Sequence, residues 1–440
     1  MASSATGGTL FPILKNELRT VRTSLWLRPA AFCIAAALGA GLLAVIDSLL
    51  PRDSLDWLPE TDPETIIELL KLLATGMLTV ATVTLSVLML VLSLAAGQVS
   101  PRAVPAVMAD VVTQNALATF LATFVYALTA LLCIGFNAVT GPGGAALLFL
   151  GALLLALNAI RYIVQWAHHV AQILKLNSMV HRIHHHGARV LEDYLECEPA
   201  ARCDQVATAG RALSRIFPEA AGYVQLIDAE RLHHLACEYD LVVRLGVQEG
   251  DFVHPRLAMM EVYGARPDDD GLANLGATVV TGFERSHEGD PRLAVVLLAE
   301  IACRALSPGI NDPQSALACI SSLGSLLALA GERPPGRYPP SRSADGRVEF
   351  VRPDFAAMLE RAYRPVMRDG AAIAEVICGI AEELRRLAAG VAPEYLDLLT
   401  AEAARAQAQG ERSLQLEADK QALRDKVASL RDAVAARGGR

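Results

Sequence analysis

One apolar stretch of the chain carries hydroxyl side chains at helical spacing. From Leu72 to Pro101 there is no charged residue, and five of the hydroxyl residues there lie four, three, four and seven residues apart, on one face of a helix. Such hydroxyl residues usually pack against a neighbouring membrane helix, but they can also line a pore, where they replace part of the hydration shell of an ion. The pore-lining candidates, including the polar end of the segment, are Thr75, Thr79, Thr82, Ser86, Ser93, Gln98 and Arg102.

A second polar group lies in the string RALSPGINDPQSA, residues 304–316. Ser307-Pro308-Gly309 should end one helix. Asp312 can cap the next helix with its carboxylate, and Pro313 suits the first helical position, where a missing N–H costs nothing. The string is then a rigid helical hairpin. The alternative is an anion or partner site at the new helix N-terminus, with the candidate residues Arg304, Ser307, Asn311, Asp312 and Ser315.

Six histidines gather between residues 168 and 186. His181 with His184 or His185 has the i, i+3 or i+4 spacing that could hold a metal ion. No matching carboxylate or cysteine pair completes a ligand set, so we predict no metal site and no cofactor. The alternatives are a polar helix face near lipid headgroups and a pH sensor.

Signatures of known enzyme classes are missing from the sequence. It has no Walker phosphate loop, nucleophile elbow, His-Glu-x-x-His motif or glycine-rich dinucleotide turn. No charge lies in the hydrocarbon part of any apolar run, which argues against a proton pump or charge-coupled transporter. The net charge of −8 argues against a nucleic-acid partner. We therefore predict a protein that is not an enzyme.

The apolar runs predict membrane-spanning helices that position these residues. Between Asp110 and Arg161 the chain has no charged side chain, and Gly141-Pro142-Gly143-Gly144 interrupts the run. A bilayer core of ~30 Å needs ~20 apolar residues per helix, so this run should form two spans. The four predicted spans are residues 30–50, 65–101, 115–139 and 145–165.

Short-loop charges predict the orientation. The first 28 residues hold four basic side chains and one acidic one, whereas the loop from Asp47 to Glu64 holds one basic and six acidic side chains. Because cytoplasmic loops carry the excess of Lys and Arg, we expect both termini in the cytoplasm of a bacterial inner membrane.

The remainder of the chain is predicted to form a soluble α+β region. A helix is expected from His168 to about Leu195 and another from Arg202 to Phe217, followed by alternating β-branched runs that predict a small barrel-like β module. Helices should follow at 293–306, 313–330, 354–370 and 371–390. The tail repeats apolar residues that predict a short coiled coil or, alternatively, a solvated amphipathic helix; they are Leu416, Leu423, Val427, Leu430 and Val434.

These elements predict a membrane domain followed by a cytoplasmic α+β domain. The predicted parts are an N-terminal segment (1–28), a four-helix transmembrane domain (29–167), a juxtamembrane helical segment (168–217), the β module (218–267), a helical cytoplasmic domain (268–392) and a helical tail (393–440).

The strings RALSPGINDPQSA, GFERSHEGDPRL and GQVSPRAV together resemble a bacterial family of predicted four-pass membrane proteins, domain of unknown function 2254. The resemblance covers roughly residues 15 to 390. Ser315 stands where the family usually has Thr, and Gly282-Phe283-Glu284-Arg285-Ser286 departs mildly from its GERT-like element. The resemblance implies the architecture and leaves the activity open.

Three hypotheses for the function remain at this point. The first is a homo-oligomeric, channel-like protein that contacts lipid and conducts ions along the hydroxyl face, with the cytoplasmic domain as filter or gate. The second is a non-permeating receptor or scaffold that binds a protein or small ligand. The third, a lipid-facing enzyme, would depend on the juxtamembrane histidines.

Overall fold

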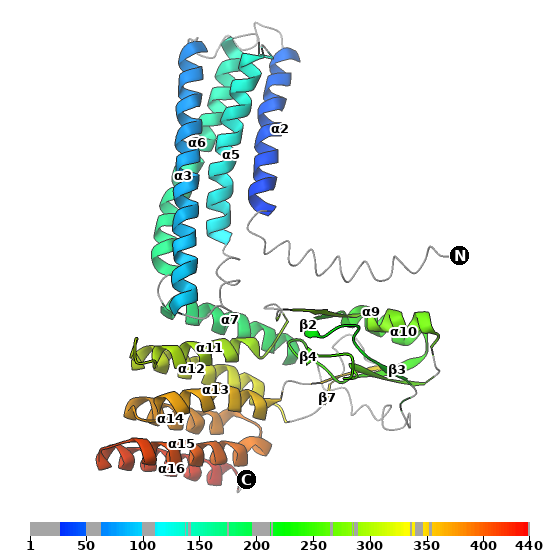
Figure 1. Ribbon diagram of the computed structural model, residues 1–440, viewed down its shortest axis with the longest axis vertical. Coiled ribbons are helices and arrows are strands. Elements are labelled where there is room, and N and C mark those ends of the chain that lie inside the picture. Colours follow the sequence, from blue (N-terminus) through cyan, green and yellow to red (C-terminus); the bar gives the residue numbers. More distant parts are fainter. Residues whose placement is uncertain are drawn as a thin grey trace. The chain divides into compact units, whose positions relative to one another are not determined.

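The computed structural model folds the chain into two compact units, one within residues 19–175 and one within residues 176–440; we call them the apolar unit and the C-terminal unit (Figure 1). The structure describes residues 27–49, 63–98, 111–136, 138–139, 142–173, 176–195, 212, 214–264, 267–283, 285, 289–334, 337–338, 346–351 and 354–438.

The apolar unit consists of long helices that pack through small side chains. Its described helices are α2 (Leu27–Leu49), α3 (Pro63–Gln98), α5 (Val111–Gly135) and α6 (Pro142–Ile173). α5 packs against the other three, and Ala116, Ala127 and Ala130 on it are fully buried. Alanine lets helix backbones approach closely, as is common between membrane helices. The helix α5 begins and ends four residues before the predicted third span.

One close approach in this unit requires glycine. The hydroxyl of Tyr126 on α5 donates a hydrogen bond to the main-chain oxygen of Leu148 on α6 at 3.1 Å. A Cβ atom at Gly151, one turn further along α6, would overlap that hydroxyl. A side chain at Gly151 would therefore separate α5 from α6.

Several helices are long and apolar enough to cross a membrane. Five described helices meet this criterion by length and composition. Four are the helices of the apolar unit, with mean hydropathy of 2.1 or 2.2, and the fifth is α12 (Pro313–Gly331), with mean hydropathy of 1.4. The membrane prediction is thus supported, while composition alone leaves the number of spans open.

The C-terminal unit begins with α7 (Leu176–Leu195) and continues into two separate β-sheets. The larger sheet has the strand order β1-β5-β3-β8-β7, and the smaller has β4-β2-β6. The strands are β1 (Ser214–Ile216), β2 (Gly222–Ile227), β3 (Leu241–Leu245), β4 (Phe252–Val253), β5 (Met260–Gly264), β6 (Val279–Gly282), β7 (Arg337–Tyr338) and β8 (Val348–Val351). The helices α9 (Ala229–Glu238) and α10 (Asp269–Gly276) connect them.

The β region corrects two predictions. Its described strands form two sheets and no closed barrel, because β8 joins the larger sheet from far along the chain and pairs parallel to β3. The strand β1 also occupies the end of the helix expected from Arg202 to Phe217; residues 202–211 of that helix lie outside the described residues. The β region therefore starts before residue 218 and continues past residue 267.

Three helical pairs follow the sheets. They are α11 (Leu293–Ala305) with α12 (Pro313–Gly331), α13 (Phe355–Gly370) with α14 (Ala374–Gly390), and α15 (Leu396–Ser413) with α16 (Glu417–Gly438). α7 packs against the first pair, and each pair packs against the next, so that the helices form successive layers in Figure 1. In this arrangement each helical pair buries an apolar face against the next pair.

The tail predicted as a possible coiled coil packs within its own chain. On α16, Leu423 and Leu430 are fully buried and Val427 is nearly so, and α16 packs against α14 and α15. Leu416, at the start of the repeat, is 65% exposed. The apolar stripe of this helix is therefore already covered inside one subunit.

Candidate functional site

The hydroxyl face of α3 points away from the core of the apolar unit. Ala74, Ala81, Thr84, Leu88 and Val91 form the buried side of the helix. The predicted pore-lining residues on the described part of the helix are all exposed; they are Thr75, Thr79, Thr82, Ser86 and Ser93. Gln98 is the last residue of α3, and its side chain lies outside the described residues, as does Arg102.

Four hydroxyl groups of this face, those of Thr75, Thr79, Thr82 and Ser86, are bonded to their own helix. Thr79 donates to the main-chain oxygen of Thr75, and Thr82 to that of Leu78, both at 2.9 Å. Thr75 and Ser86 make the same bond to the residue four positions earlier. A hydroxyl group has one hydrogen and two lone pairs, so the face presents acceptor oxygens outward. Oxygen acceptors are the groups that replace water around a cation.

The second motif forms the turn between α11 and α12. Asp312 accepts hydrogen bonds from the main-chain N–H of Ser315 at 3.1 Å and from its hydroxyl at 2.5 Å. These bonds to Ser315 lower the pKa of the Asp312 carboxyl below its usual value. Asn311 adopts a left-handed backbone conformation with φ of 49°, which asparagine tolerates better than most residues. The helix-capping interpretation is confirmed.

Another polar residue of the motif, Ser307, forms a hydrogen bond within the turn itself. The Ser307 hydroxyl donates to the main-chain oxygen of Arg304 at 2.7 Å. Pro308, Gly309, Ile310 and Asn311 are exposed. The structure thus brings Asp312 and Ser315 together, while Asn311 stays on the surface.

The histidines of α7 form a partly exposed group. The rings of His181 and His185 meet edge to face at 6.4 Å between centroids. Burial first, and then the neighbouring His181 and His185, lower the pKa of His184. Within the described ranges, no group of three His, Cys, Asp or Glu side chains could hold a metal ion.

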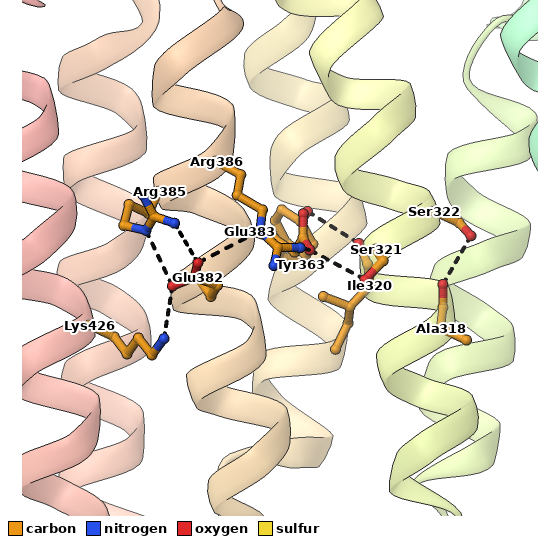
Figure 2. A network of polar contacts seen from close by, with 10 residues as sticks. All are labelled: Ala318, Ile320, Ser321, Ser322, Tyr363, Glu382, Glu383, Arg385, Arg386 and Lys426. Carbon is orange, nitrogen blue, oxygen red and sulfur yellow. Dashed lines mark hydrogen bonds and ion pairs between the residues drawn. The ribbon is translucent and has the colours of Figure 1, made fainter.

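A polar cluster around the buried residues Glu383 and Tyr363 was not anticipated from the sequence (Figure 2). The Ser321 hydroxyl on α12 donates to Oε1 of Glu383 on α14 at 3.3 Å, and Arg386 donates to the same oxygen at 2.7 Å. A Cβ atom at Gly324 would lie 2.6 Å from Glu383 Oε2. Burial, and then Glu383, raise the pKa of Tyr363 well above its usual value. The sequence signals that could have indicated this cluster are Gly324 inside a predicted helix and the charged run of residues 382–386.

The next carboxylate on α14 connects this cluster to α16. Glu382 accepts hydrogen bonds from Arg385 at 2.6 Å and from Lys426 on α16 at 2.9 Å. These two bonds, that from Arg385 first, lower the pKa of Glu382 to about 2. Figure 2 shows both carboxylates on adjacent positions of α14, with partners on α12 and α16.

A second charged cluster joins the small sheet to the start of α11. Arg292 donates to Asp251 at 2.7 Å and to the main-chain oxygen of Glu249 at 3.0 Å. The buried Asp290 accepts from the main-chain N–H of Arg292 at 3.0 Å and from Arg285 at 2.7 Å. Because each of these carboxylates has an arginine or main-chain donor, the cluster holds the two segments together. Asp290 and Arg292 belong to the GFERSHEGDPRL string.

Comparison with known proteins decides the family. The sequence profile described as "Predicted membrane protein (DUF2254)" matches residues 22–386. The chain belongs to this family. An uncharacterized protein of Mycobacterium bovis and one of Mycobacterium tuberculosis are each 25% identical to it over 380 residues, which cover 84% of this chain and 72% of the relative. No solved structure matches.

Membership in the DUF2254 family confirms the predicted resemblance and the prediction of a membrane protein. The match includes the hydroxyl face of α3, the histidines of α7 and the turn before α12, but not α15 or α16. The family description names no activity, so the function must be inferred from the residues.

Proposed function

We propose that this protein is a homo-oligomeric, channel-like protein of the bacterial inner membrane, in which the hydroxyl face of α3 lines a path for cations and the cytoplasmic C-terminal unit filters or gates it. The observation that carries the proposal is the outward direction of that face. Four neighbouring turns of α3 expose a hydroxyl group, and the core of the unit covers none of them.

A second copy of the chain would give this face a polar environment. In a single subunit the face would meet lipid, whereas in a ring of subunits it can meet its own copies or water. Since the hydroxyl hydrogens are donated to main-chain oxygens of α3, the lone pairs that remain favour cations over anions.

In this proposed function four helices span the membrane, and both termini lie in the cytoplasm. The four helices of the apolar unit have higher mean hydropathy than α12. α12 instead packs against α7, α11, α13 and α14 of the C-terminal unit. The basic N-terminal segment and the acidic loop after α2 support the orientation.

The experiment measures oligomeric state and ion flux on the full-length protein. Light scattering in detergent should show an oligomer, and vesicles containing the protein should pass K⁺ faster than Cl⁻. In the variant Thr79→Val/Thr82→Val the side chains keep their shape and lose their hydroxyls, and K⁺ flux should fall several-fold.

The matched control lies on the other face of the same helix. Thr84 donates the same type of bond to Val80, at 2.8 Å, but its side chain is buried. Thr84→Val should therefore leave K⁺ flux unchanged. A monomeric particle, flux no greater than that of empty vesicles, or equal loss in both variants would refute the proposal.

The exposed turn of the family motif favours a second candidate, a non-permeating receptor or scaffold. Ile310 at its tip is 47% exposed, although it is apolar. A partner bound at this turn would cover it. A protein without flux, whose binding to a partner is abolished by Ile310→Ser, would favour this candidate.

A further inference from the structure

The segment that runs from the last part of α6 into α7 has an unusual charge. Residues 161–191 contain four Lys or Arg and six of the ten histidines of the chain, and no Asp or Glu, although the net charge of the whole chain is −8. Blocks of one charge sign commonly mark a surface for a partner of opposite charge. The partner of this segment should therefore be anionic.

The basic residues of α7 lie on the side of the helix opposite to its buried side chains. Met179, Val180, Ile183 and Val190 are buried, and α7 packs against α11 and α12. The opposite side exposes His181, Arg182, His185 and Arg189, and two exposed acidic residues, Glu192 and Asp193, follow them in the last turn before Leu195.

The exposed basic side chains form one continuous face. His181, His185 and Arg189 follow one another at intervals of four residues, so they lie along one side of the helix over about 12 Å. Within the part of the chain that the structure describes, neither Arg182 nor Arg189 forms an ion pair with a carboxylate. Their guanidinium groups are planar forks that suit phosphate oxygens.

Chain connectivity keeps the start of α7 near the membrane surface. The apolar part of α6 ends at Val170, and α7 begins at Leu176. Six residues can span at most about 20 Å, so α7 begins close to the headgroups. An acidic protein domain has no such tether, and a lipid headgroup is always present at this place.

We propose that the exposed face of α7, with Arg182 and Arg189 as its main contacts, binds the phosphate groups of anionic phospholipids at the membrane surface where α6 ends. The histidines add N–H donors beside the two guanidinium groups. The proposal does not depend on permeation, because its ligand is the membrane itself.

Lipid binding to the full-length protein tests this proposal directly. The protein in neutral detergent is titrated with phosphatidylglycerol or phosphatidylcholine, and bound lipid is counted by native mass spectrometry. We expect the wild type to prefer phosphatidylglycerol. Because each basic residue near an anionic surface contributes about fivefold in affinity, Arg182→Gln/Arg189→Gln should weaken phosphatidylglycerol binding about 25-fold.

Two further variants separate this face from general charge. Arg182→Lys/Arg189→Lys keeps the charge and should keep most of the preference. Arg256→Gln/Arg412→Gln removes two exposed arginines elsewhere in the C-terminal unit and should leave the preference unchanged. No preference in the wild type, a preference that survives Arg182→Gln/Arg189→Gln, or equal loss in the control pair would overturn the proposal.

Discussion

Replacing Asp312 by alanine tests whether the family motif acts chiefly as a helix cap. The Asp312 carboxylate accepts one main-chain N–H and one hydroxyl from Ser315. Loss of an N-cap bond costs about 1 kcal/mol, and loss of the hydroxyl bond about another 1 kcal/mol. We therefore expect Asp312→Ala to lower the free energy of unfolding by about 2 kcal/mol.

The same interaction predicts a graded series of variants. Ser315→Ala removes only the hydroxyl bond and should cost about 1 kcal/mol. Asp312→Asn keeps an oxygen for the N-cap bond but replaces the oxygen that accepts the Ser315 hydroxyl by an NH2 group, so it should also cost about 1 kcal/mol. For a unit of this size, a loss of 2 kcal/mol lowers the midpoint of thermal unfolding by about 4 °C. Thermal unfolding of the purified protein, followed by circular dichroism, measures the series.

The pH dependence of the Asp312→Ala effect gives an independent check. The pKa of Asp312 is lowered in the folded state, so its stabilisation is fully present above the ordinary carboxyl pKa of about 3.9 and is lost as the pH falls through the folded value. The difference between wild type and Asp312→Ala should therefore be constant from pH 7 to about 5 and shrink below about 3.9. Equal stability of both proteins at pH 7, or a difference that does not shrink in acid, would refute the reasoning.

Two further predictions concern packing in the C-terminal unit. A Cβ at Gly187 would overlap the Cβ of Ala294 on α11, so Gly187→Ala should destabilise the protein by about 1–2 kcal/mol. Gly390→Ala is the control, because no atom lies within 4 Å of a Cβ added there. Its thermal unfolding should be unchanged or slightly stabilised. Leu423 is fully buried and Leu416 is 65% exposed, so Leu423→Ala should cost about 2–5 kcal/mol and Leu416→Ala little. A Leu423→Ala protein that unfolds like the wild type but loses its oligomeric state in light scattering would show instead that this stripe joins subunits.

Helix positions in the apolar unit could be predicted closely because hydropathy is a local property. Each of the four predicted spans overlaps one described helix almost completely, since about 20 apolar residues can form a membrane helix regardless of distant residues. The cap at Asp312 was predictable for the same reason, because it depends on a residue only three positions away.

The β region was predicted less well because its pairing is not local. Alternating runs indicated strands, but β8 follows β3 by roughly a hundred residues and pairs parallel to it. The short strand β1 lies next to β5, and this pairing overrides the helical pattern expected up to Phe217. Periodicity shows which side of a segment is apolar, but not which segment covers it.

The sequence by itself determined that this protein has apolar membrane helices, a one-sided hydroxyl stripe on the second of them and a capped hairpin at Asp312, because each depends on residues within one or two helical turns. Only the tertiary structure decided that the stripe faces outward, that Leu423 is covered by its own chain and that Ser321 and Glu383 meet between α12 and α14. The physical reason is that packing partners lie tens of residues apart, and burial depends on which surfaces come together in space.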